Sequence, residues 1–296
     1  LHYLPFGAIH DGEHYLVEDY AIGYMPSASV LRYVNAKTPG REDARKVLVL
    51  GNPANEAVTP LPAAEREAQA VADLFDVAPY LNAEATEARL WEQAAGTHYV
   101  HIAAHGAFNE TAPQFSRLYL APSEATGDTV TGTLSSRTDG LLETREVWTL
   151  PLEDAELVTL SACQTQLGDL SAGDELVGLS RAFLYAGTPS LVASLWSVED
   201  ESTAYLMTHF YGYLQDGMGK AEALRQAQLD TMVEYPSPYH WAAFTLIGEM
   251  GTLSAEPLEG KATPSDNNDS GTGLWIGGGV VLLVLLGAGW WMRRRR

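Results

Sequence analysis

The stretch "ELVTLSAC", residues Glu156–Cys163, ends in the only cysteine of the 296-residue chain. Its apolar and β-branched residues predict a strand buried inside a sheet. A second stretch of the same kind, "HYVHIAA" at His98–Ala104, is followed directly by His105 and Gly106. Ligands of open parallel sheets bind just beyond the carboxyl ends of the strands. If the two strands are neighbours, a histidine and a cysteine occupy equivalent positions in such a site.

Apolar runs alternate with amphipathic segments on both sides of these two strands. This alternation is typical of an α/β fold, in which helices flank a mainly parallel sheet. The same patterns predict further strands at residues 46–53, 118–122, 189–196 and 241–248. They predict helices at residues 61–75, 86–95, 141–150, 175–186, 201–215 and 220–233.

The composition of the chain narrows the class of partner. There are 18 Lys and Arg against 38 Asp and Glu, a net charge of −20, which favours a neutral or basic protein partner over nucleic acid. One cysteine cannot form an internal disulfide, and the sequence has no paired-cysteine zinc motif, so we expect neither a metal nor a cofactor. The thiol of Cys163 is therefore either a buried apolar group or a reactive one.

Cys163 and His105 together suit nucleophilic catalysis. A thiol is a weak nucleophile until it is deprotonated, and an adjacent imidazole both favours the thiolate and can protonate a departing amine. The backbone N–H groups of Gly106 and Cys163 are candidate donors to the oxyanion of the intermediate. Gly106 has no Cβ and so allows close approach of a substrate carbonyl. These residue types point to peptide-bond cleavage.

Four segments, which include "HIAAHGAF", "LSAC" and "SLW", carry a resemblance to a known family. They are His101–Phe108, Leu160–Tyr211, Leu4–Leu31 and His240–Gly248. They resemble the CHAT-domain family, which consists of caspase-like peptidases of clan CD related to separases. The resemblance covers about Leu1–Gly251. It implies a caspase-like three-layer sandwich with a mainly parallel sheet flanked by helices.

The resemblance also implies roles for particular residues. His105 is then the general acid and base, and Cys163 the nucleophile, of a cysteine peptidase. One position departs from the family pattern, because Gln166 stands where the family more often has glycine. The chain begins with Leu1 rather than Met, so we expect an upstream part. The family pattern implies a helical-repeat region there, or an activating partner bound through it.

Two acidic residues are candidates for substrate binding. In "SLWSVEDES", Asp200 falls where separase-like relatives carry the aspartate that receives a basic side chain, which predicts cleavage after Arg or Lys. Asp200 can equally cap a helix that begins near Glu201. Asp174, in the loop after Cys163, is a second candidate and can equally cap the helix from Glu175.

The carboxyl-terminal part of the sequence predicts a membrane anchor. A polar linker at residues 252–273 separates the domain at 1–251 from an uncharged segment at 274–292. That segment is long enough to cross a bilayer as one helix, and tryptophans lie near both of its ends. The basic residues Arg293–Arg296 predict a cytoplasmic tail, which places the domain on the outer face of the membrane. This orientation requires an export signal upstream.

Alternative interpretations are open for the tail and for the function. The tail also resembles the cleaved C-terminal sorting signals of bacterial surface proteins, and a buried helix is a third reading. For function, the leading hypothesis is a membrane-anchored cysteine endopeptidase that cleaves a protein partner. The alternative is a catalytically silent interaction or scaffold module, and an acyltransferase with the same two residues ranks below both. His98 and His101, within their strand, are interpreted as structural.

Overall fold

The computed structural model describes residues 4–27, 29–30, 34, 45–107, 109, 112–123, 138–164, 175–196 and 198–251. Contacts divide the chain into one unit at Leu1–Ala255 and another at Glu256–Arg296, and the described residues all belong to the first. The predicted linker, membrane segment and basic tail lie outside the described residues. Within the described part, no helix is both long enough and apolar enough to cross a membrane.

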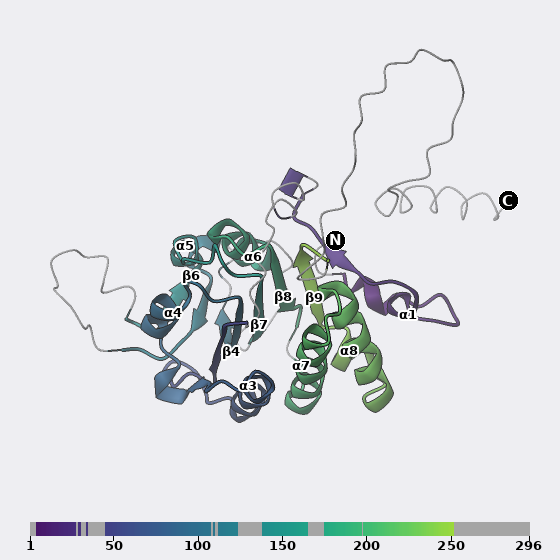
Figure 1. Ribbon diagram of the computed structural model, residues 1–296, viewed down its shortest axis with the longest axis horizontal. Helices are drawn as coiled ribbons and strands as arrows, with labels where there is room; N and C mark the ends of the chain where they lie inside the picture. Colours follow the sequence, from purple (N-terminus) through teal and green to yellow (C-terminus); the bar gives the residue numbers. More distant parts are fainter. Residues whose placement is uncertain are drawn as a thin grey trace, which may run out of the picture. The chain divides into compact units, whose positions relative to one another are not determined.

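The described strands form one mixed sheet (Figure 1). Their bounds are Gly23–Tyr24 (β1), Val47–Gly51 (β2), Tyr80–Leu81 (β3), Tyr99–Ala107 (β4), Arg117–Tyr119 (β5), Leu141–Glu143 (β6), Leu157–Gln164 (β7), Ser190–Ser194 (β8) and Phe244–Gly248 (β9). The main path runs in the order β1-β9-β8-β7-β4-β2-β3, and all neighbours along it are parallel except β8 and β9. β5 pairs antiparallel with the end of β4, and β6 pairs antiparallel with β5.

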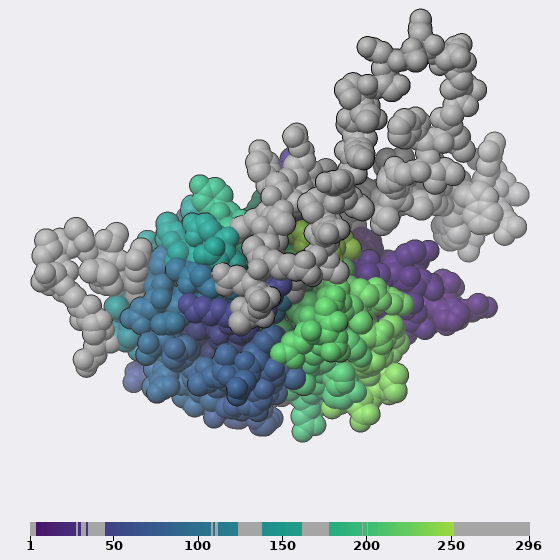
Figure 2. All heavy atoms as spheres, viewed as in Figure 1, coloured from purple at the N-terminus to yellow at the C-terminus, as the bar shows by residue number. Residues whose placement is uncertain are grey.

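Helices cover both faces of this sheet (Figure 1). The α-helices of the described part are Leu16–Asp19 (α1), Pro62–Leu74 (α3), Glu87–Gln93 (α4), Thr144–Val147 (α5), Glu175–Ala186 (α6), Asp200–Gln215 (α7), Lys220–Glu234 (α8) and Pro238–Trp241 (α9). Short 3-10 helices lie at Phe6–Ala8 (η1), Asn82–Glu84 (η2) and Pro113–Phe115 (η3). One apolar core lies between the sheet and α3, α7 and α8, and the other lies between the sheet and α4, α5 and α6. In the space-filling view, the blue atoms of α3 and the green atoms of α7 lie side by side (Figure 2).

Successive residues of β4 alternate between the two cores, as the pleat of a strand requires. Val100, Ile102 and Ala104 pack into the core beneath α4, α5 and α6. Tyr99 packs into the opposite core beneath α3, α7 and α8. Because both faces are covered by helices, the strand is buried almost throughout rather than on one face only. The same alternation assigns His105 to the face that α3 covers.

The predicted α/β class, with a mainly parallel sheet flanked by helices, is confirmed by this architecture. The predicted helix at 141–150 is wrong at both ends, because Leu141–Glu143 pair with β5 and form β6, and the helix ends at Val147. Helix α5 begins only at Thr144, where the side chains of Glu143 and Glu146 complete a capping box. The long-range strand pairing therefore overrides the local helical pattern.

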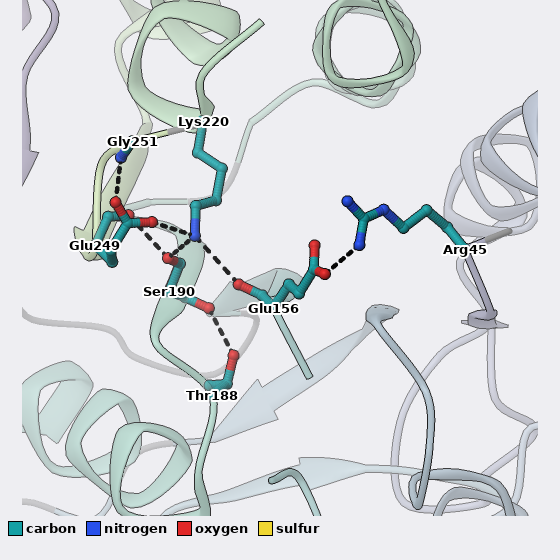
Figure 3. Close-up of polar contacts among 7 residues, drawn as sticks. All are labelled: Arg45, Glu156, Thr188, Ser190, Lys220, Glu249 and Gly251. Atoms are coloured by element: carbon teal, nitrogen blue, oxygen red, sulfur yellow. Dashed lines mark hydrogen bonds and ion pairs between the residues drawn. The ribbon is translucent and has the colours of Figure 1, made fainter. Parts of the chain in front are cut away.

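A buried lysine contacts residues of several elements near the amino-terminal ends of β7 and β8 (Figure 3). The Nζ atom of Lys220, in α8, lies 2.6 Å from Glu249 Oε2 and donates hydrogen bonds to Ser190 Oγ and to the Glu156 carbonyl. Glu156 in turn pairs with Arg45. Burial lowers the pKa of Lys220, while the charge of Glu249 opposes that shift. This cluster lies at the opposite ends of the strands from His105 and holds α8 against the sheet.

Candidate active site

The two strands that the sequence singles out are direct neighbours in the sheet. β4 and β7 pair in parallel from Tyr99 with Leu157 to Gly106 with Gln164. Within this register, His105 and Cys163 are Cα partners. The expected placement of the histidine and the cysteine at equivalent positions of adjacent strands is therefore confirmed, while their chemical roles stay predictions.

Both strands extend further than the sequence predicts, so that His105, Gly106 and Cys163 lie inside strands rather than beyond their ends. The extension of β4 has a structural cause. β2 pairs with β4 only as far as Ala103, and β5 then takes its place on that side by pairing with His105, Gly106 and Ala107. The extra antiparallel partner supplies main-chain hydrogen bonds to residues that would otherwise be in a loop.

Gly106 has Cα partners in both neighbouring strands, Leu118 in β5 and Gln164 in β7. It thus lies between two paired strands inside the sheet. Oxyanion binding by the N–H groups of Gly106 and Cys163 stays a prediction. The side chain of Cys163 lies outside the described part, which gives its backbone position alone.

The imidazole of His105 is buried, and its Nε2 atom lies 2.6 Å from the carbonyl oxygen of Thr59. A carbonyl oxygen only accepts hydrogen bonds, so Nε2 is the nitrogen that carries the proton. In the neutral ring Nδ1 then has the lone pair and is the atom able to take a proton. Thr59 could not be predicted from the sequence, because a main-chain carbonyl leaves no signal in residue type.

Of the two predicted substrate-binding residues, Asp200 and Asp174, the structure describes only the backbone of Asp200. Asp200 is the first residue of α7, which follows β8 in the chain. Because β8 is parallel to β7, the chain leaves β8 at the same end of the strands as His105. The interpretation of Asp200 as a helix cap is wrong by one residue, because Glu199 has extended backbone and takes the N-cap position. The side chain of Asp200, and all of Asp174 and Gln166, lie outside the described residues.

A chain of buried polar side chains lies on the same face of the sheet as His105. Ser161 Oγ donates to Glu67 Oε2 at 2.9 Å, and Glu67 Oε1 lies 3.2 Å from His101 Nε2. His101 Nδ1 lies 3.3 Å from the hydroxyl of Tyr211, which donates to Thr159 Oγ1 at 2.8 Å. Burial raises the pKa of Tyr211, so its hydroxyl stays protonated and able to donate. We call these five residues the polar ladder.

The polar ladder accounts for His101, one of the two histidines that the sequence pattern marked as structural. His101 and Tyr211 are buried and use their polar atoms within the ladder rather than at His105. His98 is likewise structural, since its Nδ1 accepts a hydrogen bond from the backbone N–H of Lys46. Among the described residues, no group of three or more His, Cys, Asp or Glu side chains could hold a metal ion.

A mainly parallel sheet between two helical layers, with a histidine and a cysteine on adjacent central strands, defines a three-layer α/β domain. The family model described as "CHAT domain" matches residues 1–249 of the chain. The chain therefore belongs to the CHAT domain family, which confirms the family that the sequence motifs indicated.

Known proteins similar to the chain include much longer ones. Tetratricopeptide repeat protein 28 of Mus musculus is 26% identical over 286 residues, which cover 84% of this chain and 12% of that protein. This chain thus spans about an eighth of the length of that relative. Among solved structures, a chain of the Saccharomyces cerevisiae separase–securin complex has a TM-score of 0.49 at 13% identity, over 83% of this chain and 14% of that chain. The Arg-specific cysteine proteinase gingipain R (RGPB) of Porphyromonas gingivalis has a TM-score of 0.46 at 12% identity, over 74% of this chain and 48% of that chain.

Proposed function

We propose that the chain is a membrane-anchored cysteine endopeptidase in which Cys163 and His105 cleave a protein partner. The observation that carries this proposal is the register of β4 and β7, which makes these two residues Cα partners. Membership of the CHAT domain family supports it. The contact of His105 Nε2 with the Thr59 carbonyl supports it further, because that contact leaves Nδ1 as the proton acceptor.

In the proposed reaction, Nδ1 of His105 takes the proton of the Cys163 thiol, and the thiolate attacks the carbonyl carbon of the scissile peptide bond. The oxyanion that forms accepts hydrogen bonds from the N–H groups of Gly106 and Cys163. The imidazolium then gives its proton to the leaving amine as the C–N bond breaks. Water hydrolyses the remaining thioester, which releases the carboxylic acid and restores the thiol.

The proposed substrate has a basic residue before the scissile bond. Asp200 supports this proposal because it begins α7, the element that follows the carboxyl end of β8, and β8 is parallel to the β7 strand of Cys163. A carboxylate there would pair directly with an Arg or Lys side chain. Asp174 is a second candidate for the same role. The net charge of −20 further favours a basic partner over an acidic one.

The proposed location is the cell envelope, with residues 274–292 crossing the membrane and Arg293–Arg296 on the cytoplasmic side. The proposed activating partner binds through an upstream helical-repeat region. The name of the mouse relative, a tetratricopeptide repeat protein, supports such repeats. A reporter enzyme fused after Arg296 tests the orientation, and an exocytoplasmic reporter would overturn it.

Alkylation of the single cysteine tests the peptidase proposal, because every event reports on Cys163. We expect the full chain to react quickly well below the free-thiol pKa of about 8.5, and His105→Ala to abolish that reactivity. His14→Ala, at an exposed histidine, is the matched control and should react as the wild type does. An ordinary thiol that is insensitive to His105→Ala would favour the catalytically silent scaffold module.

A further inference from the structure

The Thr59 carbonyl belongs to the loop of residues 52–61 that joins β2 to α3, here called the β2–α3 loop. Thr59 and the following Pro60 are exposed, so burial of their side chains does not hold the carbonyl in place. Pro60 restricts Thr59 to extended backbone, which limits the local conformation but not the position of the loop. Another group must therefore keep this oxygen 2.6 Å from His105 Nε2.

Asn52 closes the β2–α3 loop at its base. Its Oδ1 atom accepts a hydrogen bond of 2.6 Å from the backbone N–H of Leu61, two residues beyond Thr59. Its backbone N–H donates to the carbonyl of Ala103, two residues before His105 in β4. One residue thus links the returning end of the loop to the strand that carries the imidazole.

The side-chain nitrogen of Asn52 also forms hydrogen bonds. Its Nδ2 donates to Asn82 Oδ1 at 2.9 Å and to Glu65 Oε2 at 3.0 Å. Asn52 is buried, and its φ of 47° lies in the left-handed region that asparagine tolerates better than most residues. Aspartate would lack the donor, glycine would lack the side chain, and alanine would lack the side-chain hydrogen bonds and be strained.

We infer that Asn52 is a positioning residue, which holds the Thr59 carbonyl against His105 and thereby keeps the imidazole proton on Nε2. Asn52 acts through the loop and does not touch the reacting atoms. Its importance for catalysis rests on the proposed function, because Nδ1 must be the proton acceptor for Cys163. Its effect on the His105 tautomer does not depend on that function.

The ¹⁵N chemical shifts of His105 in the full chain test this inference, with the resonance assigned by its loss in His105→Gln. We expect the wild type to show a proton on Nε2. Asn52→Gly keeps the left-handed backbone available and removes only the side chain, so it should give a mixture of the two tautomers. Asn52→Asp is the second variant, since it retains the acceptor for Leu61 but not the donor. It should convert a smaller fraction of His105 to the other tautomer than Asn52→Gly does.

Asn55→Ala is the matched control in the same loop. Asn55 Nδ2 donates to the carbonyls of Leu120 and Gly140, and its Oδ1 accepts from the backbone N–H of Ala57. Its loss therefore loosens the earlier part of the loop and leaves the bond from Leu61 to Asn52 in place. We expect His105 in Asn55→Ala to keep the wild-type tautomer. If Asn52→Gly leaves the tautomer unchanged, or if Asn55→Ala alters it equally, the inference is wrong.

The alkylation rate of Cys163 at pH 6 separates failure of this inference from failure of the proposed function. With an active His105, Asn52→Gly should slow alkylation roughly tenfold, the effect of one lost hydrogen bond of ordinary strength. A reactive wild-type thiol that Asn52→Gly does not slow would overturn the inference and leave the peptidase proposal standing. An unreactive wild-type thiol would overturn the proposal that Cys163 is activated in this chain without its activating partner, and the tautomer shifts would still decide the role of Asn52.

Discussion

Ser161 Oγ donates a 2.9 Å hydrogen bond to Glu67 Oε2, and this bond joins β7 to α3 two residues before Cys163. Both side chains are buried, so neither can exchange its partner for water. Because α3 directly follows the β2–α3 loop, the same segment of chain contacts His105 through Thr59 and β7 through Glu67. The positions of the two candidate catalytic strands are thus coupled through α3.

Replacing Glu67 should destabilise the fold. Glu67→Ala leaves Ser161 and His101 without their partner and opens a cavity, so we expect a loss of roughly 2–4 kcal/mol in the free energy of unfolding. Urea denaturation measures this loss. Gln69→Ala, at an exposed position of the same helix, is the control and should change stability by less than about 0.5 kcal/mol. Equal effects of the two variants would contradict a structural role for the polar ladder.

The carboxyl of Glu87 should make stability fall as the pH rises. Burial, followed by the charges of Glu146 and Asp139, raises its pKa to about 8. Between pH 4.5 and 8 the unfolded chain ionises this group while the folded chain does not, so stability falls by up to about 1.4 kcal/mol per pH unit. Glu87→Gln removes this contribution. We therefore expect the variant to gain stability relative to the wild type across that range.

Thermal melting of both proteins from pH 4 to 9 measures the effect of Glu87. The difference between the variant and the wild type should be smallest near pH 4 and grow up to about pH 8. Glu84→Gln, at an exposed neighbouring position, is the control for a general effect of removing one negative charge. A constant difference over the whole range would show that Glu87 is ionised in the folded protein.

Removing the charge of Lys220 should lower the free energy of unfolding, because Glu249 and Ser190 then lose their common partner. We expect Lys220→Met to lower the free energy of unfolding by roughly 3 kcal/mol, since it leaves a carboxylate without its buried partner. Adding Glu249→Gln should restore part of that loss. A double-mutant cycle measured by urea denaturation gives the coupling, and strictly additive effects would contradict the ion pair.

The proposed specificity depends on the charge of Asp200. In peptides that differ only at the residue before the scissile bond, Arg and Lys should be cleaved best. Asp200→Asn should lower kcat/KM for these peptides by at least about 30-fold, the usual effect of removing one partner of a desolvated charge pair. Glu201→Gln, at the next and exposed position, should have little effect. A preference for Asp or Leu, retained in Asp200→Asn, would overturn the proposed basic pocket.

The predicted bounds of an element agree with the structure when the interactions that form it are local in the sequence. They disagree when the element depends on residues far away in the chain. The α6 helix at Glu175–Ala186 has its predicted bounds, because its apolar period is a local property. The predicted helix at 141–150 begins with β6 and only then forms α5, because its first residues pair with β5, which lies earlier in the chain. Likewise, the lengths of β4 and β7 depend on partner strands that no local pattern identifies.

The sequence by itself determined the α/β class, the family, and the two strands that carry His105 and Cys163, since these follow from residue types and local periodicity. The tertiary structure alone decided the contacts that would make the pair functional. Thr59 and His105 are 46 positions apart in the chain, and Glu67 and Ser161 are 94 apart. Such contacts form only when distant segments pack together, and one of them uses a main-chain carbonyl that every residue possesses.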